Sequence, residues 1–319
     1  MRKGKTSLLI GATGFIGHQL AHYLLQNNER VIGTYHNQSH KPKFDSRIRL
    51  IRCDVTEPQQ IAKAVRSAAP DFIYYLAAQS SVRIAWQEPV KTLQINFLGG
   101  VYLLETLRQI KSTSRILIFS SATAYGSSHN GIKLNEETCL RPKDPYSLSK
   151  AGIDYFARLY ANVHDLDISV VRLGNLTGPG QSTEFSIASF ASQIVKIEKG
   201  RQAAYINVGN LNARRDFLDV RDGLRAIYLV MKKGRKGEVY NIASGKTLPL
   251  KEVLSLLIGM SGNAKKIQIR RKNHLIPKDS ILSMALDPAK LVRLTGWKPK
   301  IPLRQTLGDV LYEWRNKIR

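Results

Sequence analysis

Cysteine, acidic residues and long hydrophobic runs are all scarce in this chain of 319 residues. Its two cysteines, Cys53 and Cys139, are too few for a disulfide framework and fit a reducing compartment, so we expect a cytoplasmic protein. No segment approaches the roughly 18 apolar residues of a membrane-spanning helix, so we expect no membrane insertion. Asp and Glu number 24 against 49 Lys and Arg, a net charge of +25, which excludes an acidic solvating protein and favours anionic partners.

Short apolar strands alternate with helical stretches through the first half of the chain. Strands are expected at 8–10, 30–34, 47–52, 71–76 and 115–119, with helices at 57–67 and 89–109. This alternation predicts an α/β fold with a Rossmann-type, doubly wound parallel sheet. The pattern loosens after residue 178, with helices at 186–199, 221–231 and 251–260 and strands at 204–208, 238–242 and 266–269. We therefore expect a dinucleotide-binding domain over 1–177 and a smaller α/β substrate lobe over 178–319, some segments of which return to the first domain.

Three glycines, Gly11, Gly14 and Gly17, lie between the first strand and the first helix. Glycines at such a turn allow a tight bend and let the backbone approach a pyrophosphate, while the helix N-terminus offers free N–H groups. The spacing is Gly-x-x-Gly-x-x-Gly, and it predicts a dinucleotide site. Asp54, which follows the third strand, could bind an adenine amino group or simply cap a helix.

The end of the second strand bears on the choice of cofactor. NAD-specific folds usually place an acidic residue there for the ribose 2′-hydroxyl. Here Tyr35, His36 and Asn37 follow Thr34, and no acid occurs up to Lys41. Hydroxyls, amides and a nearby cation suit a 2′-phosphate, so NADP(H) is favoured and NAD(H) stays open.

Tyr146, Lys150 and Ser121 form the candidate catalytic set. Tyr146 and Lys150 are four residues apart at the start of an expected helix and share one face. A nearby ammonium would lower the tyrosine pKa from about 10 toward the range useful for acid–base catalysis. Ser121 follows the strand at 115–119, at the sheet edge where ligands bind in such folds, and could hold the reacting oxygen.

Combined motifs carry a family resemblance over nearly the whole chain. They are GATGFIG at 11–17, LAAQSSV at 76–82, QINFLGG at 94–100, SSATAYG at 120–126, YSLSK at 146–150, NLTGPGQ at 175–181, VGNLNARRDFLDVRD at 208–222, YNIASGK at 240–246 and TGWKPKIPL at 295–303. The chain resembles the extended short-chain dehydrogenase/reductases of the NAD-dependent epimerase/dehydratase family. Within it, the second half is most similar to the GDP-4-keto-6-deoxy-D-mannose reductase branch.

This resemblance implies a role for individual residues. Tyr146 would protonate the sugar oxygen, Lys150 would hold the nicotinamide ribose, and Ser121 would orient the carbonyl. The implied cofactor-binding residues are Gly11, Thr13, Gly14, Phe15, Ile16, Gly17, Tyr35, His36, Asn37, Asp54, Val55, Leu76, Ala77, Ala78, Asn96, Tyr146 and Lys150. The implied substrate-binding residues are Ser80, Ser121, Ala122, Thr123, Asn175, Gln181 and Arg215.

Two departures from the family pattern affect the expected activity. Dehydratases of this family carry a glutamate where this chain has Thr123, which cannot exchange a proton usefully at neutral pH, so dehydration is disfavoured. The family's arginine before a proline in the substrate lobe is absent from the stretch at 275–279. We expect a reductase that uses NAD(P)H to reduce C4 of a nucleotide-diphosphate 4-keto-6-deoxyhexose, GDP-linked by preference. A 4-epimerase with retained NAD is the alternative.

Other kinds of partner have less support in the sequence. The basic surface could bind nucleic acid, but no nucleic-acid module is recognisable, so we expect attraction of an anionic substrate instead. No histidine or methionine arrangement suggests a metal site. Helices near 89–109 and 146–163 carry apolar residues on more than one face, and in this family such helices often pair in a homodimer.

Overall fold

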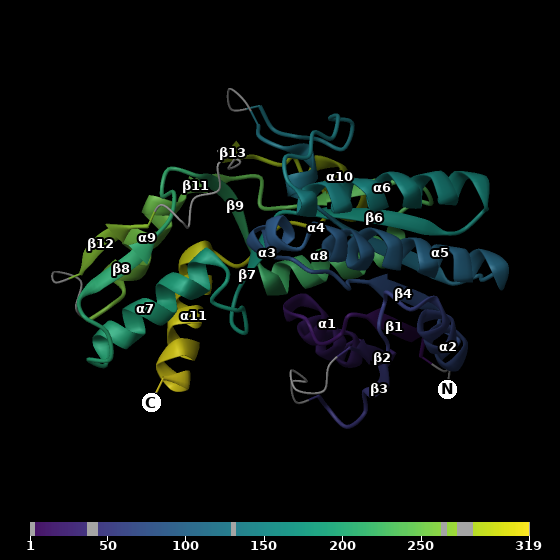
Figure 1. The fold of residues 1–319 in the computed structure, drawn as a ribbon, viewed down its shortest axis with the longest axis horizontal. Helices are drawn as coiled ribbons and strands as arrows, with labels where there is room; N and C mark the ends of the chain where they lie inside the picture. The colour runs from purple at the N-terminus through teal and green to yellow at the C-terminus, as the bar shows by residue number, and fades with distance from the viewer. Residues whose placement is uncertain (1–3, 37–43, 129–131, 263–266, 273–282, 319) are drawn as a thin grey trace.

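The computed structural model describes residues 4–36, 44–128, 132–262, 267–272 and 283–318. Asn37 and the stretch at 275–279 therefore lie outside the described residues. At its centre is a seven-stranded parallel sheet (Figure 1). In spatial order its strands are β10 (Val239–Ile242), β6 (Ile168–Leu173), β5 (Arg115–Ser121), β4 (Phe72–Tyr75), β1 (Thr6–Ile10), β2 (Arg30–Tyr35) and β3 (Arg49–Arg52). This confirms the expected Rossmann-type parallel sheet.

Helices cover both faces of this sheet because its strands are apolar on both sides. In β1, Leu8 and Ile10 contact one core and Leu9 contacts the other. The first core lies under α2 (Pro58–Ala68), α5 (Gly99–Gln109) and α6 (Pro145–Val163). The second lies under α1 (Phe15–Gln26), α8 (Val220–Lys233) and α10 (Ala289–Thr295). Full burial of a Leu or Ile side chain contributes about 1.5–3 kcal/mol, so these two faces supply most of the stability here.

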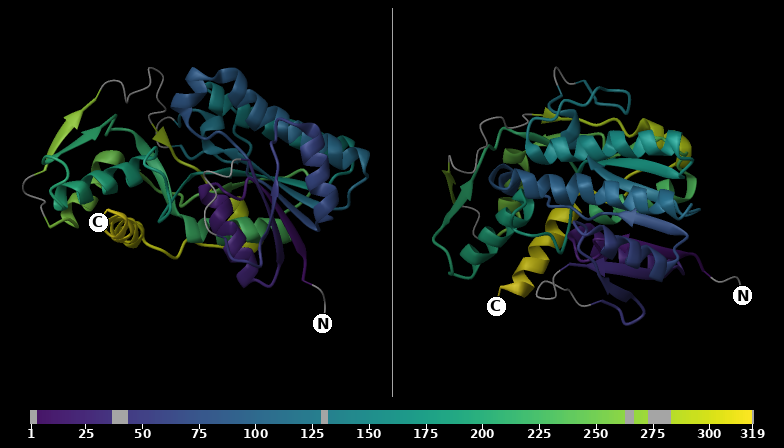
Figure 2. Two further views of the ribbon diagram at one scale, coloured as in Figure 1. Left: turned by 60° about the horizontal axis from the view of Figure 1, so that its bottom comes forward. Right: turned by 45° about the vertical axis from the view of Figure 1, so that its right-hand side comes forward.

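A smaller lobe projects beyond one end of the sheet (Figure 2). Its core is formed by α7 (Ser186–Glu198), α9 (Leu250–Gly259), α11 (Leu303–Lys317) and the two-stranded sheet of β8 (Tyr205–Val208) and β12 (Gln268–Arg271). A third sheet contains β7 (Asn175–Thr177), β9 (Arg214–Asp219), β11 (Thr247–Pro249) and β13 (Ser283–Met284). Strand β10 and helices α8 and α10 come from the second half of the chain, yet they pack with the first sheet.

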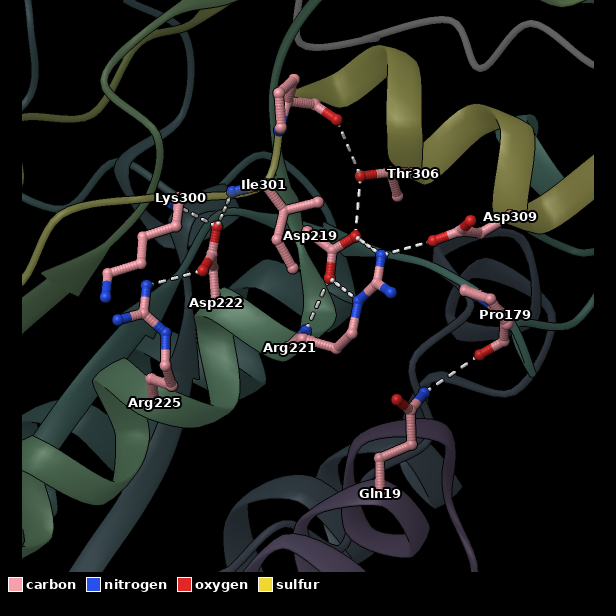
Figure 3. Close-up of polar contacts among 11 residues, drawn as sticks. Gln19, Pro179, Asp219, Arg221, Asp222, Arg225, Lys300, Ile301, Thr306 and Asp309 are labelled. Carbon is pink, nitrogen blue, oxygen red and sulfur yellow. Dashed lines mark hydrogen bonds and ion pairs between the residues drawn. The ribbon is translucent and has the colours of Figure 1, made fainter.

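Buried carboxylates join the smaller lobe to α8 (Figure 3). Asp219 accepts a hydrogen bond of 2.7 Å from the hydroxyl of Thr306 on α11. Asp222 accepts two more from backbone N–H groups of the segment that leads into α11. Gln19 donates to the carbonyl of Pro179 at 3.1 Å. The loop after β7 is therefore also bound to α1, a helix that packs on the large sheet. No helix within the described ranges is long and apolar enough to cross a membrane.

Candidate functional site

The turn between β1 and α1 has the shape that a dinucleotide pyrophosphate requires. Gly11 has a φ of +95°, and a Cβ there would lie 2.7 Å from the backbone nitrogen of Ala77. A Cβ on Gly17 would lie 2.3 Å from the carbonyl oxygen of Gly11. Gly14 caps α1 without a side-chain hydrogen bond, and no acid occupies the first turn. The first N–H groups of α1 are therefore available to an anion, and the residues present fit a dinucleotide.

The second and third strands bring two predicted cofactor residues together. The imidazole Nδ1 of His36 lies 3.3 Å from a carboxylate oxygen of Asp54, and the other oxygen accepts from the backbone N–H and hydroxyl of Thr56. Asp54 thus stabilises the turn before α2 but does not cap that helix, whose N-cap is Glu57, and it remains partly exposed beside His36. Thr34 was not foreseen: its hydroxyl accepts from the N–H of Gly11 at 3.0 Å and fixes the glycine turn on β2.

The catalytic candidates meet at the end of β5. The Ser121 hydroxyl shares a hydrogen bond of 2.9 Å with the hydroxyl of Thr123, and the Tyr146 hydroxyl lies close to Ser121. Burial raises the pKa of Tyr146, and its proximity to the Ser121 hydroxyl offsets part of this rise. Lys150 is 3% exposed, its Nζ donates to the carbonyl of Phe119 at 2.9 Å, and burial lowers its pKa to about 8. Ser121 and Tyr146 therefore lie together, and Lys150 lies one helical turn after Tyr146 with its Nζ near the end of β5.

A capped helix start places Tyr146 and Lys150. Asp144 caps α6 by accepting from the N–H of Ser147 at 2.8 Å, and the Ser147 hydroxyl returns a capping-box contact to the backbone of Asp144. Pro145 occupies the first turn, where its missing N–H removes no helical hydrogen bond. The first turn of α6 is therefore held firmly, and Tyr146 lies within it.

Asn96 is connected to the site by hydrogen bonds to Gln79 and Ser149. It lies in a π-helical turn (Gln94–Leu98) between α4 (Pro89–Leu93) and α5, so the helix expected at 89–109 is interrupted. Its amide exchanges hydrogen bonds of 2.7 and 2.9 Å with the backbone of Gln79 and donates to the hydroxyl of Ser149 at 3.0 Å. π-turns often mark functional sites, and this one joins the loop after β4 to the residue before Lys150.

The substrate side is formed by β7 and β9. Asn175 donates to the carbonyl of Asp216 at 3.3 Å, beside Arg215 on the neighbouring strand. Burial lowers the pKa of Arg215, and among the described residues no carboxylate lies within ion-pair distance of it. Within the described ranges, its guanidinium donates to the adjacent carbonyl of Arg214 and to no other group. A half-buried guanidinium with no carboxylate near it in the described part of the chain is a candidate site for an anion.

The remaining predicted site residues differ in how exposed they are. Gln181 is turned inward, where it accepts from Thr177 at 2.9 Å and donates to the carbonyl of Leu176. Ser80 is exposed, whereas Ala122 is buried in the 3₁₀ turn (Ala122–Tyr125) that follows Ser121. The predicted cofactor residues that follow or end β1, β2, β3 and β4 or begin α1 are Thr13, Phe15, Ile16, Tyr35, Val55, Leu76 and Ala78.

Comparisons with known proteins agree with this geometry. The GDP-6-deoxy-D-mannose reductase of Pseudomonas aeruginosa is 32% identical over 269 residues, which are 84% of this chain and 88% of the relative. The solved structure of RMD from Pseudomonas aeruginosa with NADPH has a TM-score of 0.83 and 30% identity, covering 98% of this chain and 100% of that one. The UDP-glucose 4-epimerase of Thermus thermophilus with NAD has a TM-score of 0.86 and 25% identity, covering 98% and 99%.

The matching family model is described as GDP-mannose 4,6 dehydratase and spans residues 8–310. That span includes the glycine turn, the Ser121–Tyr146–Lys150 cluster and the strands that carry Asn175 and Arg215. The chain belongs to the GDP-mannose 4,6-dehydratase family of extended short-chain dehydrogenase/reductases.

Proposed function

We propose that this chain reduces the 4-keto group of a GDP-linked 4-keto-6-deoxyhexose with NAD(P)H. The observation that carries the proposal is the cluster of Ser121, Tyr146 and Lys150 with Thr123, and not an acid, beside it. A dehydratase needs an extra acid–base group to remove water, and a hydroxyl supplies none at neutral pH. We therefore do not assign the dehydration in the family's name to this chain.

The proposed reaction combines a hydride transfer from the cofactor with a proton transfer from Tyr146. A bound nicotinamide supplies a hydride to C4 of the ketosugar. The Tyr146 hydroxyl gives its proton to the carbonyl oxygen, so the ketone becomes an alcohol and the cofactor is oxidised. Ser121 donates a hydrogen bond that orients the same oxygen, and its proximity offsets part of the rise that burial imposes on the pKa of Tyr146. Lys150 would hold the nicotinamide ribose.

The glycine turn and His36 support the cofactor part of the proposal. The uncapped start of α1 faces the pyrophosphate position, and His36 and Asp54 lie at the ends of β2 and β3, where the adenosine half would bind. NADP(H) is favoured because an N–H group of the His36 imidazole can donate a hydrogen bond to a 2′-phosphate. NAD(H) stays as the alternative, since the Asp54 carboxylate is also at this edge.

Arg215 and Asn175 support the nucleotide-sugar part. A guanidinium binds the two acidic oxygens of a diphosphate better than an ammonium does. The preference for GDP rests on the motifs of the second half and on the similarity to the Pseudomonas aeruginosa reductase.

The first experiment denatures the purified protein and identifies any released nucleotide by mass and stoichiometry. A reductase uses its cofactor as a co-substrate, so we expect an empty site or weakly held NADP(H). About one NAD⁺ per chain would instead support the 4-epimerase, to which the Thermus thermophilus enzyme also points. Turnover of GDP-4-keto-6-deoxymannose with NADPH follows, and Tyr146→Phe should lower kcat at least about 100-fold.

We also propose a homodimer. The exposed face of α6 carries Leu148, Tyr155, Leu159 and Val163, each more than half exposed and spaced along one stripe. Trp86 and Val90, on the neighbouring segments α3 (Val82–Gln87) and α4, are exposed as well. A second copy of the same stripe would cover it in a two-fold arrangement.

A further inference from the structure

A buried row of polar side chains crosses the carboxyl ends of three strands. Arg172 of β6 is in register with Ser120 of β5 on one side and with Asn241 of β10 on the other. Arg172 is 1% exposed, Asn241 is 0% exposed, and Ser120 is buried as well. An arginine this deeply buried is rare unless every N–H group has a partner.

The row's first partner is the helix that carries Tyr146. Arg172 binds Asp154 of α6 with two hydrogen bonds of 2.8 and 2.9 Å, and Asp154 is fully buried. Asp154 lies four residues after Lys150 and eight after Tyr146, so all three follow one face of α6. Ser120 adds a hydrogen bond of 3.1 Å to the backbone carbonyl of Lys150.

The row's second partner is the turn that begins directly after Ser121. Tyr125 ends that turn, and its hydroxyl accepts from Arg172 at 2.8 Å and donates to Asn241 at 2.9 Å. Burial raises the pKa of Tyr125 to about 12, so its hydroxyl keeps the proton that it donates. The guanidinium carbon also lies 4.8 Å from the centre of the Tyr125 ring.

The cost of burial argues against a purely stabilising role. Moving both charges of an ion pair out of water costs several kcal/mol per ion, and apolar replacements of similar volume are often as stable. A fully satisfied buried network, by contrast, rigidifies the elements that it joins. Here the elements joined are the two that carry the neighbouring hydroxyls of Ser121 and Tyr146.

We propose that the buried row of Ser120, Arg172 and Asn241, acting through Asp154 and Tyr125, fixes Ser121 and Tyr146 relative to each other. Its members are positioning residues for proton transfer. The inference rests on the proposed function only in that Ser121 and Tyr146 carry the chemistry.

Two mild variants and one matched control test this. Tyr125→Phe removes the hydroxyl that joins Arg172 to Asn241, and Ser120→Ala removes the bond to α6. Tyr240→Phe is the control: Tyr240 is 2% exposed, its side chain packs in the core on the opposite face of the sheet, and its hydroxyl accepts from the N–H of Arg235 at 2.9 Å. All three lose one buried hydroxyl.

Steady-state kinetics gives the first readout. We expect kcat for ketosugar reduction to fall about 10-fold in Tyr125→Phe and Ser120→Ala, because small misplacements of reacting groups are costly, with the Kd for NADPH within about twofold. Tyr240→Phe should keep the wild-type kcat. Failure of the wild-type chain to reduce the ketosugar would overturn the proposed function and leave the second readout to decide the inference.

The second readout needs no activity. With ¹³Cζ-labelled tyrosine, the resonance of Tyr146 reports its hydroxyl's hydrogen bond and is assigned through Tyr146→Phe. A changed Tyr146 resonance in both row variants, and none in Tyr240→Phe, supports positioning. An unchanged Tyr146 resonance in folded Tyr125→Phe and Ser120→Ala overturns it, as does a kcat within twofold of wild type.

Discussion

Replacing Lys150 by methionine should stabilise the ligand-free protein at neutral pH while abolishing most of its activity. The Lys150 ammonium is 3% exposed and donates to one backbone carbonyl. Among the described residues, no carboxylate lies within ion-pair distance of it. Burial lowers its pKa from 10.5 to about 8. Each tenfold loss of proton affinity corresponds to 1.36 kcal/mol, so holding the charge in the folded state costs about 3 kcal/mol at pH 7. Met keeps the apolar stem and removes that charge.

The pH dependence separates this charge effect from packing. Between about pH 8 and 10.5 the unfolded chain binds the Lys150 proton and the folded chain does not, so the wild type gains stability as pH rises. The stability advantage of Lys150→Met should therefore shrink by about 2 kcal/mol between pH 7 and pH 9.5.

Urea unfolding of both proteins at several pH values measures this difference. Lys63→Met, at an exposed position on α2, serves as the control and should show no such trend. A Lys150→Met variant that is less stable than wild type at pH 7, or a gap that does not change with pH, would refute the reasoning.

Three further predictions test the other parts of the site. Arg215→Ala should raise the Kd for GDP at least about 10-fold by calorimetry, since a charge-assisted contact is lost, whereas Arg214→Ala, whose exposed side chain donates to Thr247, should change it less than about twofold; equal effects would contradict a diphosphate role for Arg215. His36→Asp should lower kcat/KM for NADPH about 10-fold or more and leave that for NADH nearly unchanged, because a carboxylate repels a 2′-phosphate; a parallel loss with both cofactors would argue against this. Leu159→Glu should convert a dimer to a monomer in sedimentation velocity, and a wild-type monomer would remove the dimer proposal.

Local sequence patterns are sufficient to predict features whose residues lie close together in the sequence. The strand–glycine–helix order of Gly11 to Gly17 predicts the turn, although the tight contact at Gly11 is with the distant backbone of Ala77 and a Cβ on Gly14 would meet nothing closer than 3.6 Å. The four-residue spacing of Tyr146 and Lys150 predicts a shared helical face, because helical periodicity does not depend on the rest of the fold. The strands at 175–177 and 214–219 were missed, because the first has only three residues and the two pair with each other across about 40 residues of sequence.

The order of short strands and helices is enough to predict the parallel sheet, and short motifs are enough to name the glycine turn and the catalytic candidates, since each rests on a repeat or spacing of a few residues. Which charges are paired and which are left exposed depends on the tertiary structure. Arg172 and Arg215 are both arginines of the second half, yet the fold pairs one with buried Asp154 and, among the described residues, leaves the other without a carboxylate. That difference depends on strand register and helix packing between distant segments, and no local pattern encodes it.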